Sequence, residues 1–245
     1  MVNEAEHPLD PVIRMAEVAV ERMNENVSDY TACLDSQVRV DGELGEERHL
    51  EVKIRHENKT GPDVTQFSVY THFLKPKAVA GQEVIWVDGW HNNNIVAHGA
   101  GLLNVKRVYL DPDGKMAMKG NRNPIYDIGI KNLLSHLLKK GYRDRQRGEC
   151  EVKVTRRVDV AGRQCTLVAV THPKPRDHFD FHIARLYVDD ELGFPIAYEG
   201  YLWPASPGSE PVLLEKFIYT NIRLNVGLKD IDFDPANEKY NFPAW

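Results

Sequence analysis

The sequence predicts an α+β fold: one large antiparallel sheet with two main helices. Most of the chain alternates apolar with polar residues, as Leu50, Val52 and Ile54 do, which is typical of half-buried antiparallel strands. Two segments instead repeat their apolar residues at helical spacing. No β-α-β rhythm and no glycine-rich phosphate loop interrupts this pattern, so a parallel sheet is not expected.

The first helix is predicted over 11–26. Asp10 is suited to the N-cap and Pro11 to the first helical position. One apolar stripe runs along it: Val12, Met15, Ala16, Ala19, Val20 and Met23.

The second helix is predicted over 124–140, capped by Asn123 and ended by Gly141. Its apolar residues are Ile125, Ile128, Leu133, Leu134, Leu137 and Leu138. Because turn-forming residues flank it on both sides, we expect this helix to be the more mobile one and to act as a lid.

The strands follow one another through short turns such as Asp41-Gly42 and Ala161-Gly162. They are predicted at 30–41, 50–55, 67–73, 84–87, 95–98, 107–110, 115–118, 151–158, 165–171, 179–189, 195–203 and 213–222. So long a meander must twist, so we expect a curled, half-open barrel with both helices on its concave face. No composition shift marks a boundary, which predicts a single domain over 1–245 with a polar tail at 1–9.

Charge and hydropathy argue against two classes of protein, nucleic-acid binders and proteins with a membrane-spanning segment. The net charge of −5 argues against a dedicated nucleic-acid binder, and no apolar run is long enough to span a bilayer. The first residues lack the basic and apolar regions of a signal peptide, so none is expected in the given chain.

The three cysteines form no CxxC pair. With a turn at Ala161-Gly162, Val158 would face Cys165; with a turn two residues earlier, Val154 would. Neither register places Cys150 opposite Cys165, so no disulfide between them is expected.

The best metal-ligand pattern is the alternation of His178, Asp180 and His182 along one face of a predicted strand. Such residue types bind zinc and similar ions, although a flat strand seldom converges three ligands on one ion, and a solvated polar face is the simpler interpretation. A general-base role for His172 requires a partner that the sequence does not reveal. The basic segment 139–147 is suited to an anionic lipid or acidic partner, or is a solvated helix end.

The order of elements resembles a bacterial family of unknown function whose members carry export signals. The segments that carry this resemblance are Leu110-Asp111-Pro112-Asp113-Gly114, Gly129-Ile130-Lys131-Asn132-Leu133-Leu134, His182-Ile183-Ala184-Arg185 and Leu213-Leu214-Glu215. More distantly, the chain resembles the lipoprotein-carrier fold of LolA and LolB, whose curled sheet and helices enclose an apolar concavity. The resemblance implies a periplasmic or otherwise exported protein without catalytic residues or cofactors.

We therefore expect a non-enzymatic envelope protein that binds a lipid or a lipoprotein acyl chain. The candidate residues for the cavity or its lid are Phe67, Phe73, Leu133, Leu134, Leu137, Phe179, Phe181 and Phe217. Two alternatives remain open at this point: a protein-interaction or sensor module with a filled interior, and a metal-dependent hydrolase centred on His178, Asp180 and His182.

Overall fold

A computed structural model describes residues 6–60, 64–101 and 104–244. The chain divides into two compact units. Unit 1 comprises Met1–Glu25 and Ile130–Phe217, and unit 2 comprises Asn26–Gly129 and Ile218–Trp245. Strand β12 contributes residues to both units, and a single domain stays a prediction.

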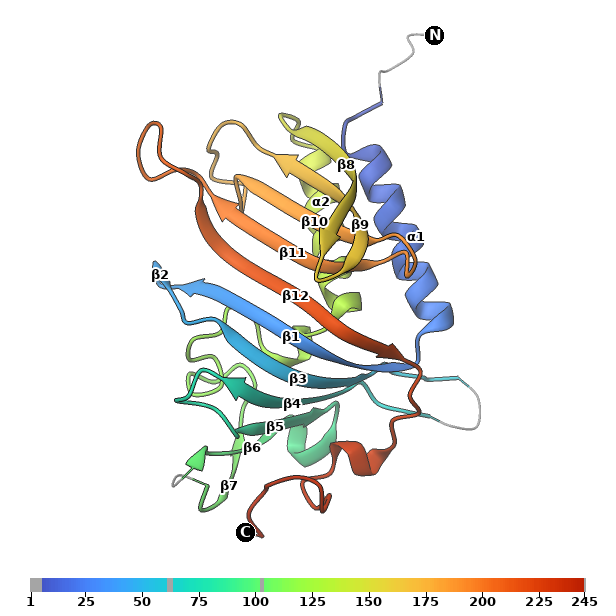
Figure 1. The fold of residues 1–245 in the computed structure, drawn as a ribbon, viewed down its shortest axis with the longest axis vertical. Helices are drawn as coiled ribbons and strands as arrows, with labels where there is room; N and C mark the ends of the chain where they lie inside the picture. Colours follow the sequence, from blue (N-terminus) through green and yellow to red (C-terminus); the bar gives the residue numbers. More distant parts are fainter. Residues whose placement is uncertain (1–5, 61–63, 102–103, 245) are drawn as a thin grey trace. The chain divides into compact units, whose positions relative to one another are not determined.

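Unit 1 holds both α-helices of the described chain, except the last residue of α1, and the strands at one end of the strand order (Figure 1). Its elements are α1 (Asp10–Asn26), α2 (Ile130–Arg145), β8 (Glu151–Val160), β9 (Arg163–Thr171), β10 (Ile183–Asp189), β11 (Pro195–Leu202) and the first half of β12 (Val212–Leu224). Apolar residues of α1 and α2 pack against one buried cluster of β9, β10 and β11, so both helices cover the same face of this unit.

Unit 2 holds the other strands. These are β1 (Asp29–Val40), β2 (Glu43–Leu44), β3 (Arg48–Arg55), β4 (Ser68–Lys75), β5 (Glu83–Val87), β6 (Ile95–His98) and β7 (Arg107–Leu110), with 3-10 turns η1 (Trp90–Asn93), η3 (Ile125–Asp127) and η4 (Asp230–Phe233). The strand order is β7-β6-β5-β4-β3-β1-β12-β11-β10-β9-β8, with β2 paired to β1. The predicted fold class, an open antiparallel sheet with two helices, is confirmed.

Local turn chemistry explains the β8–β9 hairpin. Ala161 and Gly162 both have positive φ, 50° and 82°, as a tight two-residue hairpin turn requires. Val158 is paired with Cys165, which confirms the register predicted for this turn. Cys150 and Cys165 are both free thiols, as expected from that register.

The second helix differs from its prediction at both ends. The 3-10 turn at Ile125–Asp127 precedes it, and Gly129 at φ 116° breaks the helical path, so α2 begins at Ile130. It continues through Gly141 to Arg145. Gly141 therefore lies inside α2 instead of ending it, and a Cβ there would be in ordinary van der Waals contact with Ile13 of α1, at 3.4 Å.

Two predicted strand segments are wrong. Residues 115–118 form consecutive turns, with the amide of Met118 donating to the carbonyl of Gly114. Strand β10 begins at Ile183, not at residue 179, because the amide of Phe179 closes a turn onto the carbonyl of Arg176.

Candidate functional site

An apolar layer lies between the helices and the sheet of unit 1. Its fully buried part includes Val168, Leu186 and Tyr198, at most 8% exposed. Around this part lie side chains that stay partly exposed, and we call them the apolar layer: Val12, Met15, Leu133, Leu137, Val152, Val170 and Phe217. They come from α1, α2, β8, β9 and β12, so the layer is built from five elements of one compact unit.

The structure brings several predicted cavity residues together. Leu133, Leu137 and Phe217 belong to the apolar layer, and Phe181 belongs to the buried cluster beneath it. Leu134, only 1% exposed, is buried. Phe179 stacks on His172, with ring centroids 3.7 Å apart.

The other two candidates belong to unit 2. Phe67 makes an edge contact with Trp86, with ring centroids 5.9 Å apart, and Phe73 lies in β4 opposite Leu50. Their aromatic character made them resemble the unit 1 residues in the sequence, but they pack within a different unit.

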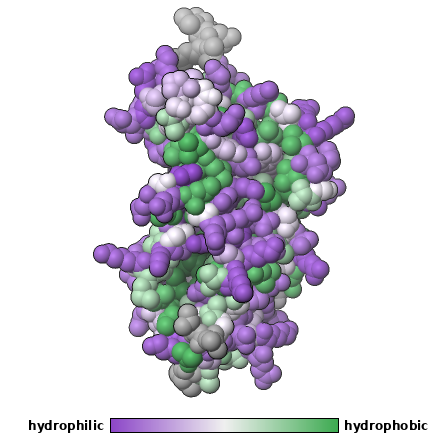
Figure 2. Space-filling view, turned by 60° about the vertical axis from the view of Figure 1, so that its left-hand side comes forward, coloured by the Kyte–Doolittle hydropathy of each residue, from purple (hydrophilic) through white to green (hydrophobic). Residues whose placement is uncertain are grey.

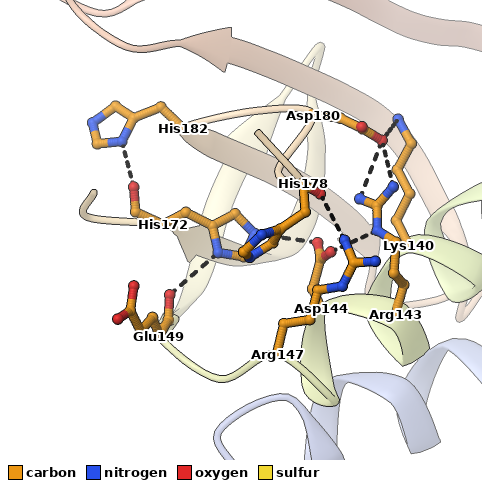
Figure 3. Close-up of polar contacts among 9 residues, drawn as sticks. All are labelled: Lys140, Arg143, Asp144, Arg147, Glu149, His172, His178, Asp180 and His182. Carbon is orange, nitrogen blue, oxygen red and sulfur yellow. Dashed lines mark hydrogen bonds and ion pairs between the residues drawn. The ribbon is translucent and has the colours of Figure 1, made fainter. Parts of the chain in front are cut away.

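The three candidate metal ligands do not converge (Figure 3). Asp180 is held by Arg143 and Lys140, whereas Nδ1 of His182 donates to the carbonyl of His172 at 2.8 Å. His178 packs its ring against the neighbouring Phe179. Within the described ranges, no group of three or more His, Cys, Asp or Glu side chains could hold a metal ion. The three residues lie in a turn before β10, so the alternation of a strand does not apply to them.

A buried histidine–carboxylate contact lies beside this turn, and sequence reasoning missed it. The ring of His172 is 0% exposed, and its Nε2 lies 3.2 Å from Oδ2 of Asp144, whose side chain is 2% exposed. Its Nδ1 lies 3.3 Å from the carbonyl oxygen of Glu149. Both ring nitrogens of this buried imidazole therefore have an oxygen atom as their neighbour. Figure 3 shows this pair joining the end of α2 to the segment after β9.

The charge of Asp144 is stabilised from two sides. Burial alone would raise the pKa of Asp144, but hydrogen bonds from His172 and Arg143 outweigh burial and lower that pKa below its ordinary value. Arg143 donates from Nε to Oδ1 of Asp144 at 2.9 Å. The carboxylate of Asp144 therefore has the Arg143 guanidinium and the His172 ring as its two neighbours, and the lowered pKa favours its charged form.

The neighbouring thiol is not activated. Burial, together with the negative charge of Asp144, raises the pKa of Cys150 to about 11. A nucleophilic cysteine requires the opposite shift, which produces a thiolate at neutral pH. The group around His172 therefore has the features of a structural anchor, not those of a nucleophilic site.

Two cations of α2 share the carboxylate of Asp180. Arg143 donates to Oδ2 of Asp180 from both terminal nitrogens at 3.2 Å, and Nζ of Lys140 lies 3.6 Å from the same oxygen. The side chains are 30% exposed for Lys140, 32% for Arg143 and 43% for Asp180. The next residue, Phe181, is 5% exposed and belongs to the buried cluster.

These arrangements can be set beside known proteins. A family model matches residues 27–242. The chain belongs to DUF1571, a family of proteins of unknown function. This confirms the family resemblance read from the sequence, and a comparison with curated proteins gave no match.

Several solved structures are similar to this member of DUF1571. The Pseudomonas aeruginosa MucA/MucB complex matches at 18% identity over 91% of this chain and 60% of the other, with a TM-score of 0.48. The Mycobacterium tuberculosis lipoprotein LppX matches at 14% identity over 92% and 100%, with a TM-score of 0.47. A putative outer membrane lipoprotein-sorting protein domain from Vibrio parahaemolyticus matches at 11% identity over 91% and 95%, with a TM-score of 0.42.

Proposed function

We propose that this protein is a non-enzymatic binding protein of the cell envelope, in which the apolar layer of unit 1 holds an acyl chain or another apolar ligand. The observation that carries the proposal is the partial exposure of that layer. Apolar side chains of both helices point at the same buried cluster and yet keep contact with solvent. The envelope location rests on the sequence resemblance, and no helix of the described residues is long and apolar enough to cross a membrane.

The helices and the sheet of unit 1 leave part of their facing apolar surface exposed to water. Helix and sheet layers normally remove their facing apolar side chains from water, so surface left over between them can be covered by a ligand. Each buried methylene contributes about 0.8 kcal/mol, so eight of them supply about 6 kcal/mol before the ordering costs. Figure 2 shows that hydrophobic side chains also reach the surface in patches between hydrophilic ones.

The test is equilibrium binding of decanol, an uncharged ligand with one acyl-like chain. Wild-type protein should bind it, and Leu137→Glu should abolish binding because the variant places a charge in the apolar layer. Val18→Glu is the matched control, since Val18 lies on α1 and is 62% exposed.

Both variants are checked for a wild-type circular dichroism spectrum and cooperative unfolding. A milder variant, Leu133→Gln, replaces Leu137→Glu if the latter does not fold. Wild-type protein that binds no decanol would contradict the proposal and would favour the alternative of a protein-interaction module with a filled interior.

A further inference from the structure

The apolar stripe of α2 ends in positive charge. Leu133 and Leu137 belong to the apolar layer, and Lys140 follows Leu137 by three residues, which places it on the same side of the helix one turn further. Arg143 follows after another three residues. Along α2, the apolar contacts are thus followed by two cations near the C-terminal end of the helix.

Asp180 satisfies these two cations only in part. Oδ2 of Asp180 accepts hydrogen bonds from both terminal nitrogens of Arg143, and Nζ of Lys140 lies near the same oxygen. Asp144 accepts from a different nitrogen of Arg143, the Nε, and is itself shared with His172. Figure 3 shows Lys140 and Arg143 reaching Asp180 from α2, on the far side of the drawn group from His182.

The shared carboxylate is exchangeable. Its side chain is 43% exposed, so releasing it into water leaves no buried charge behind. Nε of Arg143 stays bonded to Asp144, which keeps the guanidinium oriented while its two terminal nitrogens change partner. A planar fork of this kind matches a carboxylate or a phosphate.

We propose that Lys140 and Arg143 bind the headgroup of an anionic amphiphile, a single-chain lipid ending in a carboxylate or a phosphate, whose anion replaces Asp180 while its chain covers the apolar layer. This inference rests on the proposed function and names its ligand class. Two neighbouring residues carry the inference. Asp180 pairs with the cations, and Phe181, the next residue, is packed in the cluster under the layer.

The experiment compares the affinities of decanoate, decyl phosphate, decanol and decylamine for the full chain. Wild-type protein should bind an anionic compound about fivefold or more tightly than decanol, and decylamine most weakly. The tighter of the two anions distinguishes a fatty acid from a phosphate-bearing lipid, and either preference supports the proposal.

Variants then assign the effect to named residues. Arg143→Gln and Lys140→Gln should each weaken binding of the preferred anion about fivefold and leave decanol binding unchanged. Lys139→Gln is the matched control, because Lys139 is the adjacent cation of α2 and is exposed. Lys140→Gln leaves the contacts of Asp144 intact, so it remains informative if Arg143→Gln unfolds.

Asp180→Asn should change the affinity for the anion in the opposite direction. Removing the competing carboxylate should strengthen binding of the anion and not that of decanol, a result that a purely structural ion pair does not produce. Equal affinities of wild-type protein for decanol and both anions would overturn the headgroup site while leaving the proposed function standing. No binding of any of the four compounds would overturn both.

Discussion

Removing the buried carboxylate of Asp144 is expected to destabilise the protein strongly. Asp144→Ala deletes the acceptor of His172 Nε2 in a place where the His172 ring is 0% exposed. Water therefore cannot replace the lost hydrogen bond without opening the contact between α2 and the segment after β9. The stacked ring of Phe179, 3.7 Å from the imidazole, closes one side of the site.

The size of the effect follows from the groups left without partners. An unsatisfied buried hydrogen-bonding group costs about 1–3 kcal/mol. Arg143 loses the acceptor of its Nε but keeps Asp180, whereas the buried Nε2 of His172 loses its carboxylate neighbour. We expect a decrease of about 2 kcal/mol in the free energy of unfolding.

Urea-induced unfolding followed by circular dichroism measures this difference. The control is Glu149→Gln, which breaks the Glu149–Arg176 pair; both of its side chains are 46% exposed, so the loss should stay below about 1 kcal/mol. Adding His172→Phe to Asp144→Ala should recover part of the stability, because the orphaned donor disappears. A loss for Asp144→Ala no larger than that of Glu149→Gln would refute the reasoning.

Two further predictions concern unit 2. Gly129→Ala should destabilise by more than about 1 kcal/mol in thermal unfolding, because φ is 116° and the new Cβ would meet Tyr30 Oη at 3.2 Å and Ile54 Cδ1 at 3.3 Å; an unchanged melting temperature would contradict this. Burial opposes but does not outweigh the hydrogen bonds, chiefly from His98, that lower the pKa of Glu83 below its ordinary 4.5. The charged carboxylate of Glu83 contributes its full stabilisation above pH 4.5, and this stabilisation is lost as the pH falls through the lowered pKa. The difference in unfolding free energy between wild type and Glu83→Gln should therefore shrink below pH 4.5. A difference that grows on acidification would contradict the lowered pKa of Glu83.

The parts of the fold that sequence predicted best are those encoded locally. The Ala161-Gly162 turn and the register that pairs Val158 with Cys165 depend on neighbouring residues only. The bounds of α2 were less predictable, because Gly141 has the residue type of a helix end but lies inside α2, where it faces Ile13 of α1. Sequence spacing alone cannot distinguish a glycine that ends a helix from one that lies within it.

The candidate site shows the same division. Leu133, Leu137 and Phe217 were named from their apolar character, and the structure places them in one layer. The partner of His172 could not be found, because Asp144 is 28 residues away on another element. His178, Asp180 and His182 do not share the face of a strand, because the chain forms a turn and bends at the positions where the alternation indicated a strand.

The central claim is that the apolar layer of unit 1 holds the ligand, and methyl-selective NMR titration with decanol tests it most directly. We expect shifts for the methyl groups of Leu133, Leu137, Val152 and Val170, with little change at Ile85 and Val87, which belong to a packed cluster of unit 2. Shifts confined to unit 2, or no shifts at saturating decanol, would contradict it.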